Sequence, residues 1–483
     1  MEITPDRIAR QPPEAQEMIL YLLERVAQCE QRIAELEERL EMTPDNSSLP
    51  PSSQHPHAQG TKAPRKPRNS AKQRKRGGQP GHKKHKRELI PLEDVDELVS
   101  LYPQTCRGCG EKLAGRDDEP LRQQVWELPP IRPTVTEYQR HRLTCLCCRT
   151  TTCAELPEGV SDSQAGPRLT ALAAILMSCF RQSKRQTELF FESVLSVPAS
   201  TGWLVKLQTR ATHTLRPAYD ELQQAVREQA RLGIDETPFR QSTQRVWIWV
   251  FVALHFTLFR IRGSRKREEL DDTLGDQYAG IVTSDRARMY HHLEHVQYCW
   301  AHLKRDFQSL ADSRHEQARE IGEALLQQTR KLFRQHARYR DGTISQAGLK
   351  SSLGGARREV EALLLRGLKC DHRKTAGMCQ ELCFNRKRLW LFLEHEGVEP
   401  TNNHSERALR SAVIWRKLSF GTQSESGSRF VETMLTVLET CRRQNKNTIE
   451  YITEALTTGK PTSLLGGVSV HAHSSRSGAV SPA

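Results

Sequence analysis

The chain has 483 residues, of which 37% are hydrophobic, enough for two or three domains with cores of their own. Lys and Arg number 72 against 58 Asp and Glu, and the net charge of +14 favours a polyanionic partner, nucleic acid first. The longest strongly apolar run, Val246–Leu254, is about half the roughly 20 residues of a membrane-spanning helix, and Met1–Arg10 is too polar for a signal peptide. We therefore expect a cytoplasmic protein without membrane contact.

Residues 14–42 predict a coiled coil. Their apolar residues recur in alternating steps of three and four, the spacing of a single narrow seam. The seam consists of Ile19, Leu22, Val26, Cys29, Ile33, Leu36 and Leu40. Such a seam favours a homo-oligomer, a dimer first. A helix packed on its own domain is the alternative.

Residues 43–90 predict a disordered basic linker, because they are rich in Pro, Ser, Gly and cations and lack apolar periodicity. Its cations have no acid between them: Lys62, Arg65, Lys66, Arg68, Lys72, Arg74, Lys75, Arg76, Lys83, Lys84, Lys86 and Arg87. So dense a block is typical of salt-sensitive, sequence-independent binding to DNA phosphates. A solvated spacer is the alternative.

Residues 91–158 predict a zinc-binding module. Thirteen cysteines stand singly along the chain except for one cluster here, which favours a metal site over a disulfide framework. The predicted ligands form two Cys-x2-Cys knuckles, Cys106 with Cys109 and Cys145 with Cys148. Four thiolates leave no open coordination position, so the zinc would be structural. The 35 residues between the knuckles exceed the usual spacing, Cys147 and Cys153 compete as ligands, and buried unliganded cysteines are the alternative.

Residues 159–230 predict helices. The pattern from Thr170 to Phe191 is that of one long amphipathic helix, Pro198 interrupts it, and Ser200 is placed to cap the next helix. That second helix carries Lys206 and Arg210. A helix-turn-helix that binds DNA and generic helical packing both fit this pattern.

Two aspartates follow short apolar strands in the second half of the chain. Leu232-Gly-Ile-Asp235-Glu-Thr, stopped by Pro238, leads into Arg245–Ile261, whose Val, Ile, Trp and Phe are typical of buried strands. A second strand, Gly280–Ser284, ends in Asp285. Carboxylates at two strand ends can share divalent ions for phosphoryl transfer. Turn residues after strands are the alternative for each aspartate alone.

The stretch Thr401–Ser411 predicts a capped helix that presents Glu406, with Arg407 and Arg410 beside it. Glu406 is a candidate third metal ligand. Taken alone, it is explained equally by a surface ion pair with Arg410, four residues further along the helix.

Taken in order, these motifs resemble the transposases of the insertion sequence 66 family. The matching stretches are Gly-Ile-Asp235-Glu-Thr-Pro, Ser-Asp285 with Tyr290, Cys299-Trp-Ala-His302-Leu-Lys-Arg-Asp-Phe307, Asn402-Asn-x2-Glu406-Arg-Ala-Leu-Arg410, Lys417 and Gly421. Before the zinc module, Asn46-Ser-Ser-x-Pro-Pro-Ser-Ser and Gly77-Gly-Gln-Pro-Gly-His82 resemble the linker of such proteins. The resemblance covers about residues 15 to 450. Several ordered motifs that agree are more specific than any one.

The resemblance implies a multidomain α+β protein with a ribonuclease H-like α/β catalytic core at residues 231–450. A helical insertion at about 310–396 would separate Asp285 from Glu406. Asp235, Asp285 and Glu406 would bind two Mg²⁺ or Mn²⁺ ions for DNA strand cleavage and strand transfer. Further DNA contacts are expected at His302, Lys304, Arg305, Arg407, Arg410 and Lys417, with solvated charge as the alternative. Residues 461–483 predict a disordered tail.

One departure from the family pattern lies beside the second aspartate, where Arg286-Ala287 replaces the usual Gly-Tyr. The resemblance further implies a bacterial, nucleoid-associated protein that works with small accessory transposition proteins. The runner-up function is a non-catalytic DNA-binding protein, a decayed transposase that acts as a repressor or end-binding factor. A scaffolding protein built on the coiled coil leaves the acidic motifs unexplained.

Overall fold

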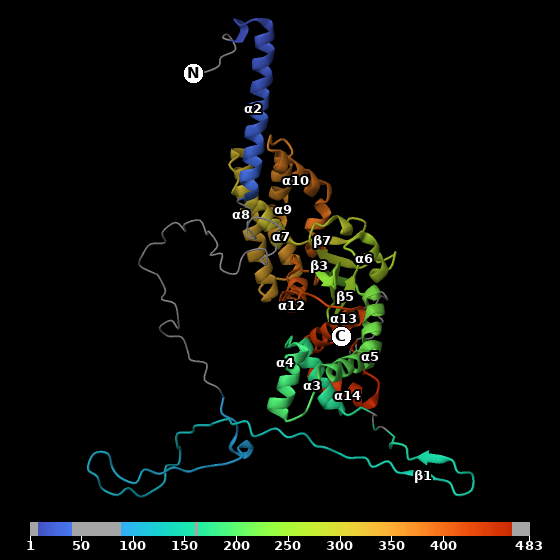
Figure 1. Ribbon diagram of the computed structural model, residues 1–483. Coiled ribbons are helices and arrows are strands. Elements are labelled where there is room, and N and C mark those ends of the chain that lie inside the picture. Colours follow the sequence, from blue (N-terminus) through green and yellow to red (C-terminus); the bar gives the residue numbers. More distant parts are fainter. Residues whose placement is uncertain (1–7, 41–87, 159, 161–162, 466–483) are drawn as a thin grey trace, which may run out of the picture. The chain divides into compact units, whose positions relative to one another are not determined.

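The computed structural model describes residues 8–40, 88–158, 160 and 163–465 (Figure 1). The chain divides into two compact units, Pro56–Arg132 and a larger unit formed by Met1–His55 and Pro133–Ala483. The cations of the predicted linker, from Lys62 to Arg87, and residues 466–483 of the predicted tail lie outside the described residues. Among the described helices, none has the length and apolar character needed to cross a membrane.

The predicted coiled-coil segment is a single helix, α2 (Pro13–Leu40). Three seam residues whose side chains are described are exposed: Leu22, Val26 and Ile33 retain 54%, 53% and 55% of their accessible surface. These side chains are therefore not covered by the described parts of their own chain. Association with a second copy remains a prediction.

The region before the main sheet is helical, as expected, with one correction. Its elements are α3 (Pro167–Ser178), α4 (Lys184–Leu195), α5 (Thr201–Ala225) and the 3-10 turn η4 (Val226–Glu228). The prediction of one helix from Thr170 to Phe191 is wrong. Ser183 starts a new helix there through a capping box with Gln186, and Arg181 adopts a left-handed backbone (φ +56°). The cap predicted at Ser200 is confirmed, since its Oγ accepts from Trp203 N at 3.2 Å.

A five-stranded sheet forms the centre of the larger unit, in the order β5-β4-β3-β6-β7. Its strands are β3 (Arg231–Gln241), β4 (Gln244–Val252), β5 (Thr257–Arg262), β6 (Ile281–Ser284) and β7 (Val296–Tyr298). The first three form an antiparallel meander, and β6 and β7 run parallel to β3. Helix α6 (Arg267–Leu274) lies between β5 and β6 in the chain. A separate two-stranded sheet pairs β1 (Arg142–Thr144) with β2 (Thr151–Cys153).

Strand β3 is longer than expected, because Pro238 does not end it. Beyond Gly233, β3 no longer pairs with β6 and its strand partner is β4, on which Trp247 lies opposite Pro238. At the end of β3, Gln241 also forms an isolated bridge with Thr422. On that stretch one edge of β3 has no strand neighbour, and proline is tolerated on such an edge because its missing N–H breaks no ladder bond. The strand therefore runs on to Gln241.

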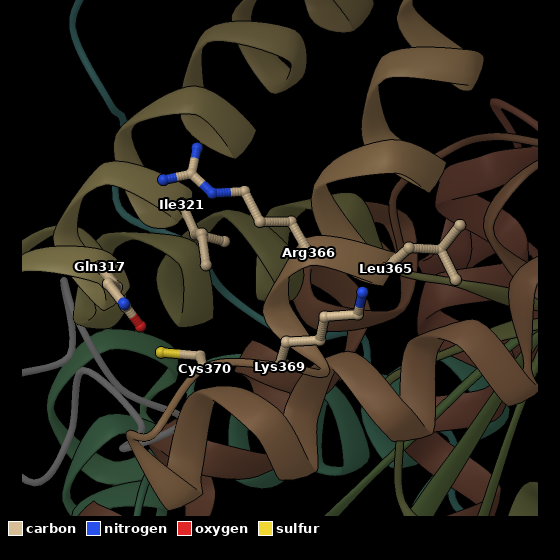
Figure 2. Close-up of a pocket in the computed structure, with 6 residues that line it drawn as sticks. All are labelled: Gln317, Ile321, Leu365, Arg366, Lys369 and Cys370. Atoms are coloured by element: carbon tan, nitrogen blue, oxygen red, sulfur yellow. The ribbon is translucent and has the colours of Figure 1, made fainter.

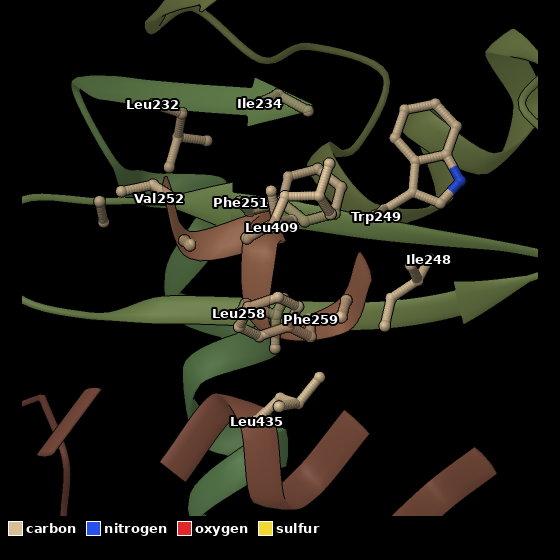
Figure 3. Packing of buried hydrophobic residues seen from close by; sticks show 14 of the residues in the cluster. Leu232, Ile234, Ile248, Trp249, Phe251, Val252, Leu258, Phe259, Leu409 and Leu435 are labelled. Carbon is tan, nitrogen blue, oxygen red and sulfur yellow. The ribbon is translucent and has the colours of Figure 1, made fainter. Parts of the chain in front are cut away.

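Two helices that follow the insertion pack on the sheet, α12 (Asn403–Ser419) and α13 (Glu425–Arg443). The last helix, α14 (Thr448–Thr458), packs on α3 and α5. Figure 3 shows Leu409 of α12 and Leu435 of α13 among buried side chains of β3, β4 and β5, including Phe251 and Phe259. This packing holds the start of α12 against β3, where the predicted catalytic residues lie.

The predicted insertion between Asp285 and Glu406 is helical, as expected. After β7 come α7 (Trp300–Ala311), α8 (Glu316–Arg340), α9 (Gln346–Gly367), α10 (Arg373–Phe384), the turn η6 (Arg386–Leu389) and α11 (Leu391–Glu394). A hollow of about 420 Å³ lies within it (Figure 2), lined by Gln317, Ile321, Leu365, Arg366, Lys369 and Cys370. The hollow contains none of the predicted catalytic residues.

Candidate active site

Asp235 and Asp285 come together through the parallel pairing of β3 and β6. The register pairs Arg231 with Ile281 and Gly233 with Thr283, so two further residues bring Asp235 level with Asp285. Asp235 is buried. Its burial, together with the charges of Glu236, Asp285 and Glu406, raises its pKa well above the ordinary value of an aspartate. These neighbours place four carboxyl groups within electrostatic reach of one another.

Glu406 reaches this site because α12 starts directly against β3. A side chain at Gly233 would place its Cβ 2.4 Å from Ser405 Oγ and 3.0 Å from Asn402 Oδ1. The missing side chain therefore permits the close approach. Asn402 fixes it by donating from Nδ2 to Ile234 O at 2.7 Å. The Gly-Ile-Asp motif and the Asn-Asn-x2-Glu motif are thus two sides of one contact.

The surroundings of Glu406 combine burial with nearby positive charge. Burial raises its pKa, and the charges of Arg305 and Arg410 oppose this change. His302 Nδ1 lies 3.6 Å from Glu406 Oε1. The ligand atoms of Cys299, His302 and Glu406 all lie within 4.8 Å of one another, which makes them a candidate metal-binding set. Burial raises the pKa of the Cys299 thiol to about 11.

His302 was expected to contact DNA phosphates, but its surroundings do not favour a positive charge. Its burial, and then the charges of Arg305 and Arg286, lower its pKa to about 4. The imidazole is therefore uncharged at neutral pH and lies beside Glu406 rather than on an open basic face. The other expected DNA contacts of this region are more accessible: Lys304, Arg407, Arg410 and Lys417 are exposed, and Arg305 is half-buried.

A fourth acidic residue of the site, Glu236, was not among the sequence predictions. Its side chain is only 4% exposed, it accepts from Tyr290 Oη at 2.9 Å, and Arg265 lies 3.1 Å away. Burial and the charge of Asp285 raise its pKa to about 7. The signal was in the sequence, since Glu236 follows Asp235 directly and Tyr290 belongs to the second motif.

A basic hollow of about 570 Å³ adjoins the loop after Asp285. It is lined by residues at the start of α6 and by the turn η5 (Arg288–Tyr290) with the residue before it, namely Arg265, Lys266, Arg267, Glu268, Ala287, Arg288 and Met289. Four of these seven side chains are cationic and exposed. Sequence reasoning missed them because Arg265, Lys266 and Arg267 are followed directly by two glutamates, and Arg288 joins them only in the fold.

The two cysteine knuckles have the same backbone geometry, although they belong to different compact units and are described separately. Cys106 N donates to Glu111 O and Gly110 N to Cys106 O. In the second knuckle Cys145 N donates to Thr150 O and Arg149 N to Cys145 O, at identical spacing. The fifth residue of each turn has a positive φ, +79° at Gly110 and +59° at Arg149. Cys109 and Cys148 therefore occupy equivalent positions.

One cysteine of each knuckle has a lowered thiol pKa, which favours the thiolate that zinc requires. A backbone hydrogen bond from Cys109 lowers the pKa of Cys106. Hydrogen bonds from Thr150, side chain first, and from Cys145 lower the pKa of Cys148 to about 7. Backbone and hydroxyl donors of this kind stabilise a charged sulfur before any metal is bound.

Comparison with known protein families decides the affiliation of the chain. A family model described as the transposase IS66 family matches residues 162–429, more than half of the sequence. This chain belongs to the IS66 transposase family. A second model, the zinc-finger binding domain of transposase IS66, matches residues 103–149, and residues 2–88 match a family of unknown function. The zinc-finger match contains both knuckles.

Two curated relatives of this IS66-family chain come from Sinorhizobium fredii. The uncharacterized protein y4qI is 24% identical over 404 residues, which cover 76% of this chain and 72% of the relative. The uncharacterized protein y4hP is 25% identical over 400 residues, covering 72% and 69%. Both matches extend well beyond one domain.

Proposed function

We propose that this protein is a DNA transposase that cleaves the ends of an insertion sequence and joins them to target DNA. The observation that carries the proposal is the convergence of Asp235, Asp285 and Glu406. Parallel register brings the two aspartates level, and the contact of α12 with Gly233 adds the glutamate. Family membership supports the same assignment.

The arrangement of the core supports a ribonuclease H-like fold. Three antiparallel strands are followed by two strands parallel to the first, with helices between and after them. This order places Asp235, within the central strand β3, beside β6, which Asp285 directly follows. We divide the chain accordingly into a coiled coil, basic linker, zinc module, helical region and catalytic core, at residues 14–42, 43–90, 91–158, 159–230 and 231–450. A helix-turn-helix within 159–230 stays a hypothesis.

The three carboxylates suit Mg²⁺ or Mn²⁺, which prefer oxygen ligands. Asp235 and Asp285 would hold the ions, and Glu406 would complete the site. Bound there, two such ions activate the attacking oxygen and stabilise the leaving oxygen of a phosphodiester. The fit is electrostatic as well as chemical, because the raised pKa of buried Asp235 reflects burial and negative neighbours that a divalent cation would compensate.

The cations around the site would hold the DNA backbone. Arg305 and Arg410 flank Glu406, and the basic hollow adds Arg265, Lys266 and Arg288 beside Asp285. Guanidinium and ammonium groups position phosphates without reading sequence. The cations of the linker, Lys62 to Arg87, would add salt-sensitive affinity from outside the core.

The zinc module would be structural, with Cys106, Cys109, Cys145 and Cys148 as its ligands. The equivalence of the two knuckles favours Cys145 and Cys148 over Cys147 and Cys153, since only the former pair matches the positions of Cys106 and Cys109. Four thiolates close the coordination sphere and leave zinc no part in strand cleavage.

The deciding experiment incubates the full-length protein with duplexes that carry the ends of its own element, Mg²⁺ or Mn²⁺, and any accessory proteins encoded with it. Asp235→Asn and Glu406→Gln should each lower strand cleavage by about 10³-fold or more while DNA binding persists. The exposed Asp276→Asn is the matched control and should cleave like the wild type. Undiminished cleavage by Asp235→Asn would refute the assignment. DNA binding without cleavage by the wild type would favour the non-catalytic alternative.

A further inference from the structure

Four polar side-chain atoms at the facing starts of α7 and α12 are buried without a hydrogen-bond partner among the described residues. They are His302 Nδ1, Arg305 Nε, Ser405 Oγ and Glu406 Oε1. Each unpaired buried group costs stability, so a cluster of them calls for a missing partner. Two of the four atoms, those of His302 and Glu406, face each other.

The distance between His302 Nδ1 and Glu406 Oε1 is 3.6 Å. This separation is too long for a hydrogen bond. Two ligands that each lie about 2.1 Å from one metal ion are about 3.0 to 3.5 Å apart, close to the observed value. Cys299 Sγ completes the cluster but already accepts from Asn402 N at 3.2 Å. The imidazole is therefore the nitrogen donor available to an ion at Glu406.

The fold holds the two residues in place through contacts at both helix starts. Trp300 N, in the first turn of α7, donates to Pro400 O at 2.8 Å, just ahead of α12. The indole of Trp300 also donates to Leu389 O at 2.8 Å. His302 and Glu406 lie in the first turns of these two helices. A metal ligand requires this kind of orientation by its surroundings.

We propose that His302 is a nitrogen ligand of the metal ion that Glu406 binds, so that the site favours transition-metal ions, Mn²⁺ among them, over Mg²⁺. The inference rests on the proposed function, because it places one of that site's ions. Mg²⁺ selects oxygen ligands and dehydrates reluctantly, whereas imidazole is a ligand of transition metals. Neutral imidazole is the form that binds them.

The competing arrangement is a direct hydrogen bond. A small rotation of either side chain would let a protonated Nδ1 of His302 donate to Glu406, and the histidine would then only orient the carboxylate. The two arrangements differ in what surrounds a bound ion. Only the first puts a nitrogen atom in the coordination sphere.

The test uses the full-length, zinc-loaded protein without DNA and titrates it with Mn²⁺. Pulsed electron paramagnetic resonance of the bound Mn²⁺ should reveal nitrogen coupling in the wild type. His302→Gln should remove that coupling and weaken Mn²⁺ binding about tenfold, with Mg²⁺ binding changed by less than about twofold. His213→Gln, an exposed histidine on α5, is the matched control and should keep both properties.

Asp235→Asn separates the two proposals. If it abolishes Mn²⁺ binding while the wild-type ion lacks nitrogen coupling, the carboxylate site stands and the role of His302 is overturned. If Asp235→Asn binds Mn²⁺ as tightly as the wild type, the ion lies elsewhere and both proposals fail. Nitrogen coupling is measured on the wild-type protein itself. Its absence there would therefore refute the inference even if His302→Gln did not fold.

Discussion

At the scale of single residues, Glu236 shows how two adjacent acids on one strand acquire different roles. Asp235 is surrounded by other carboxyl groups, whereas Glu236 is held by Tyr290 Oη and faces Arg265. Tyr290 lies in the turn that follows Asp285. Glu236 therefore connects β3 to the loop of the second aspartate, and we interpret it as a positioning residue.

The raised pKa of Glu236 predicts a pH dependence of stability. Its pKa is about 7 in the folded protein against 4.5 for an ordinary glutamate, so the folded state holds the proton more tightly. The resulting stabilisation is complete below about pH 4.5 and is lost as pH rises through 7, a difference of about 3 kcal/mol. Without Mg²⁺ or Mn²⁺, the melting temperature of the zinc-loaded protein should therefore fall between pH 5 and 7.5 by more than that of Glu236→Gln.

The exposed Glu268→Gln, on α6, is the control and should follow the wild-type pH profile. Parallel profiles for the wild type and Glu236→Gln would contradict the assigned protonation. Added Mg²⁺ should reduce the wild-type decline, because a cation near Asp285 offsets the charge that Glu236 acquires.

At the scale of elements, the helices between Asp285 and Glu406 contact the loop between β6 and β7, which carries Asp285. Arg286, next to Asp285, reaches Asp306 of α7 at 2.6 Å and Glu381 of α10 at 2.8 Å. From η6, Arg388 donates to His291 O at 2.8 Å and to Leu293 O at 3.0 Å. Arg286 thus anchors this loop to α7 and α10.

Arg286→Met should loosen that anchor. The change leaves Asp306 and Glu381 without their partner in a largely buried setting, where removing one member of an ion pair costs roughly 3 kcal/mol. The melting temperature should fall by roughly 6 °C or more, and limited proteolysis should cut residues 285–293 faster. Arg366→Met is the control, since Arg366 pairs with Glu320 at the surface and both side chains are more than half exposed. Equal effects of the two changes would show that Arg286 is no special anchor.

Local patterns predicted the elements well where local physics decides them. The strand before Asp285, the cap at Ser200 and the helical insertion follow from such patterns and are confirmed. The long helix across Ser183 was wrong because a capping box outweighed apolar periodicity. Pro238 was expected to end β3, but the strand continues past it. The proline is tolerated because β6 pairs with β3 only as far as Gly233.

Contacts between distant segments could not be predicted in this way. The outer edge of β5 is covered by α13, whose Glu432, Thr436 and Thr440 accept from the backbone N–H groups of Ile261, Phe259 and Thr257. Residues four apart on a helix advance about 6 Å, nearly the spacing of alternate strand residues. Cys299 and His302 were likewise missed as parts of the carboxylate site, because the fold brings them there from a separate motif.

At the scale of the whole molecule, clustered positive charge and exposed apolar side chains lie in different segments of the chain. Twelve cations without an acid between them stand from Lys62 to Arg87, and further cations border the carboxylate site. Exposed apolar side chains of α2, among them Leu22, Val26 and Ile33 of the seam, lie N-terminal to these cations. We interpret the first two as the DNA-binding surface and the third as the contact between copies of the protein.

The contact between copies is tested by two substitutions on α2, at positions that are about equally exposed in an isolated chain. Leu22, on the seam, is 54% exposed, and Leu20, outside it, is 57% exposed. A glutamate at either position therefore costs an isolated chain about the same. In a coiled coil Leu22 packs into the partner whereas Leu20 faces water, so Leu22→Glu should raise the dissociation constant at least about 100-fold and Leu20→Glu should leave it unchanged. Light scattering after size-exclusion chromatography measures the mass directly. Equal masses for both variants would place any oligomer contact elsewhere. If Leu22→Glu is monomeric and no longer cleaves two ends together, the seam is needed for the reaction.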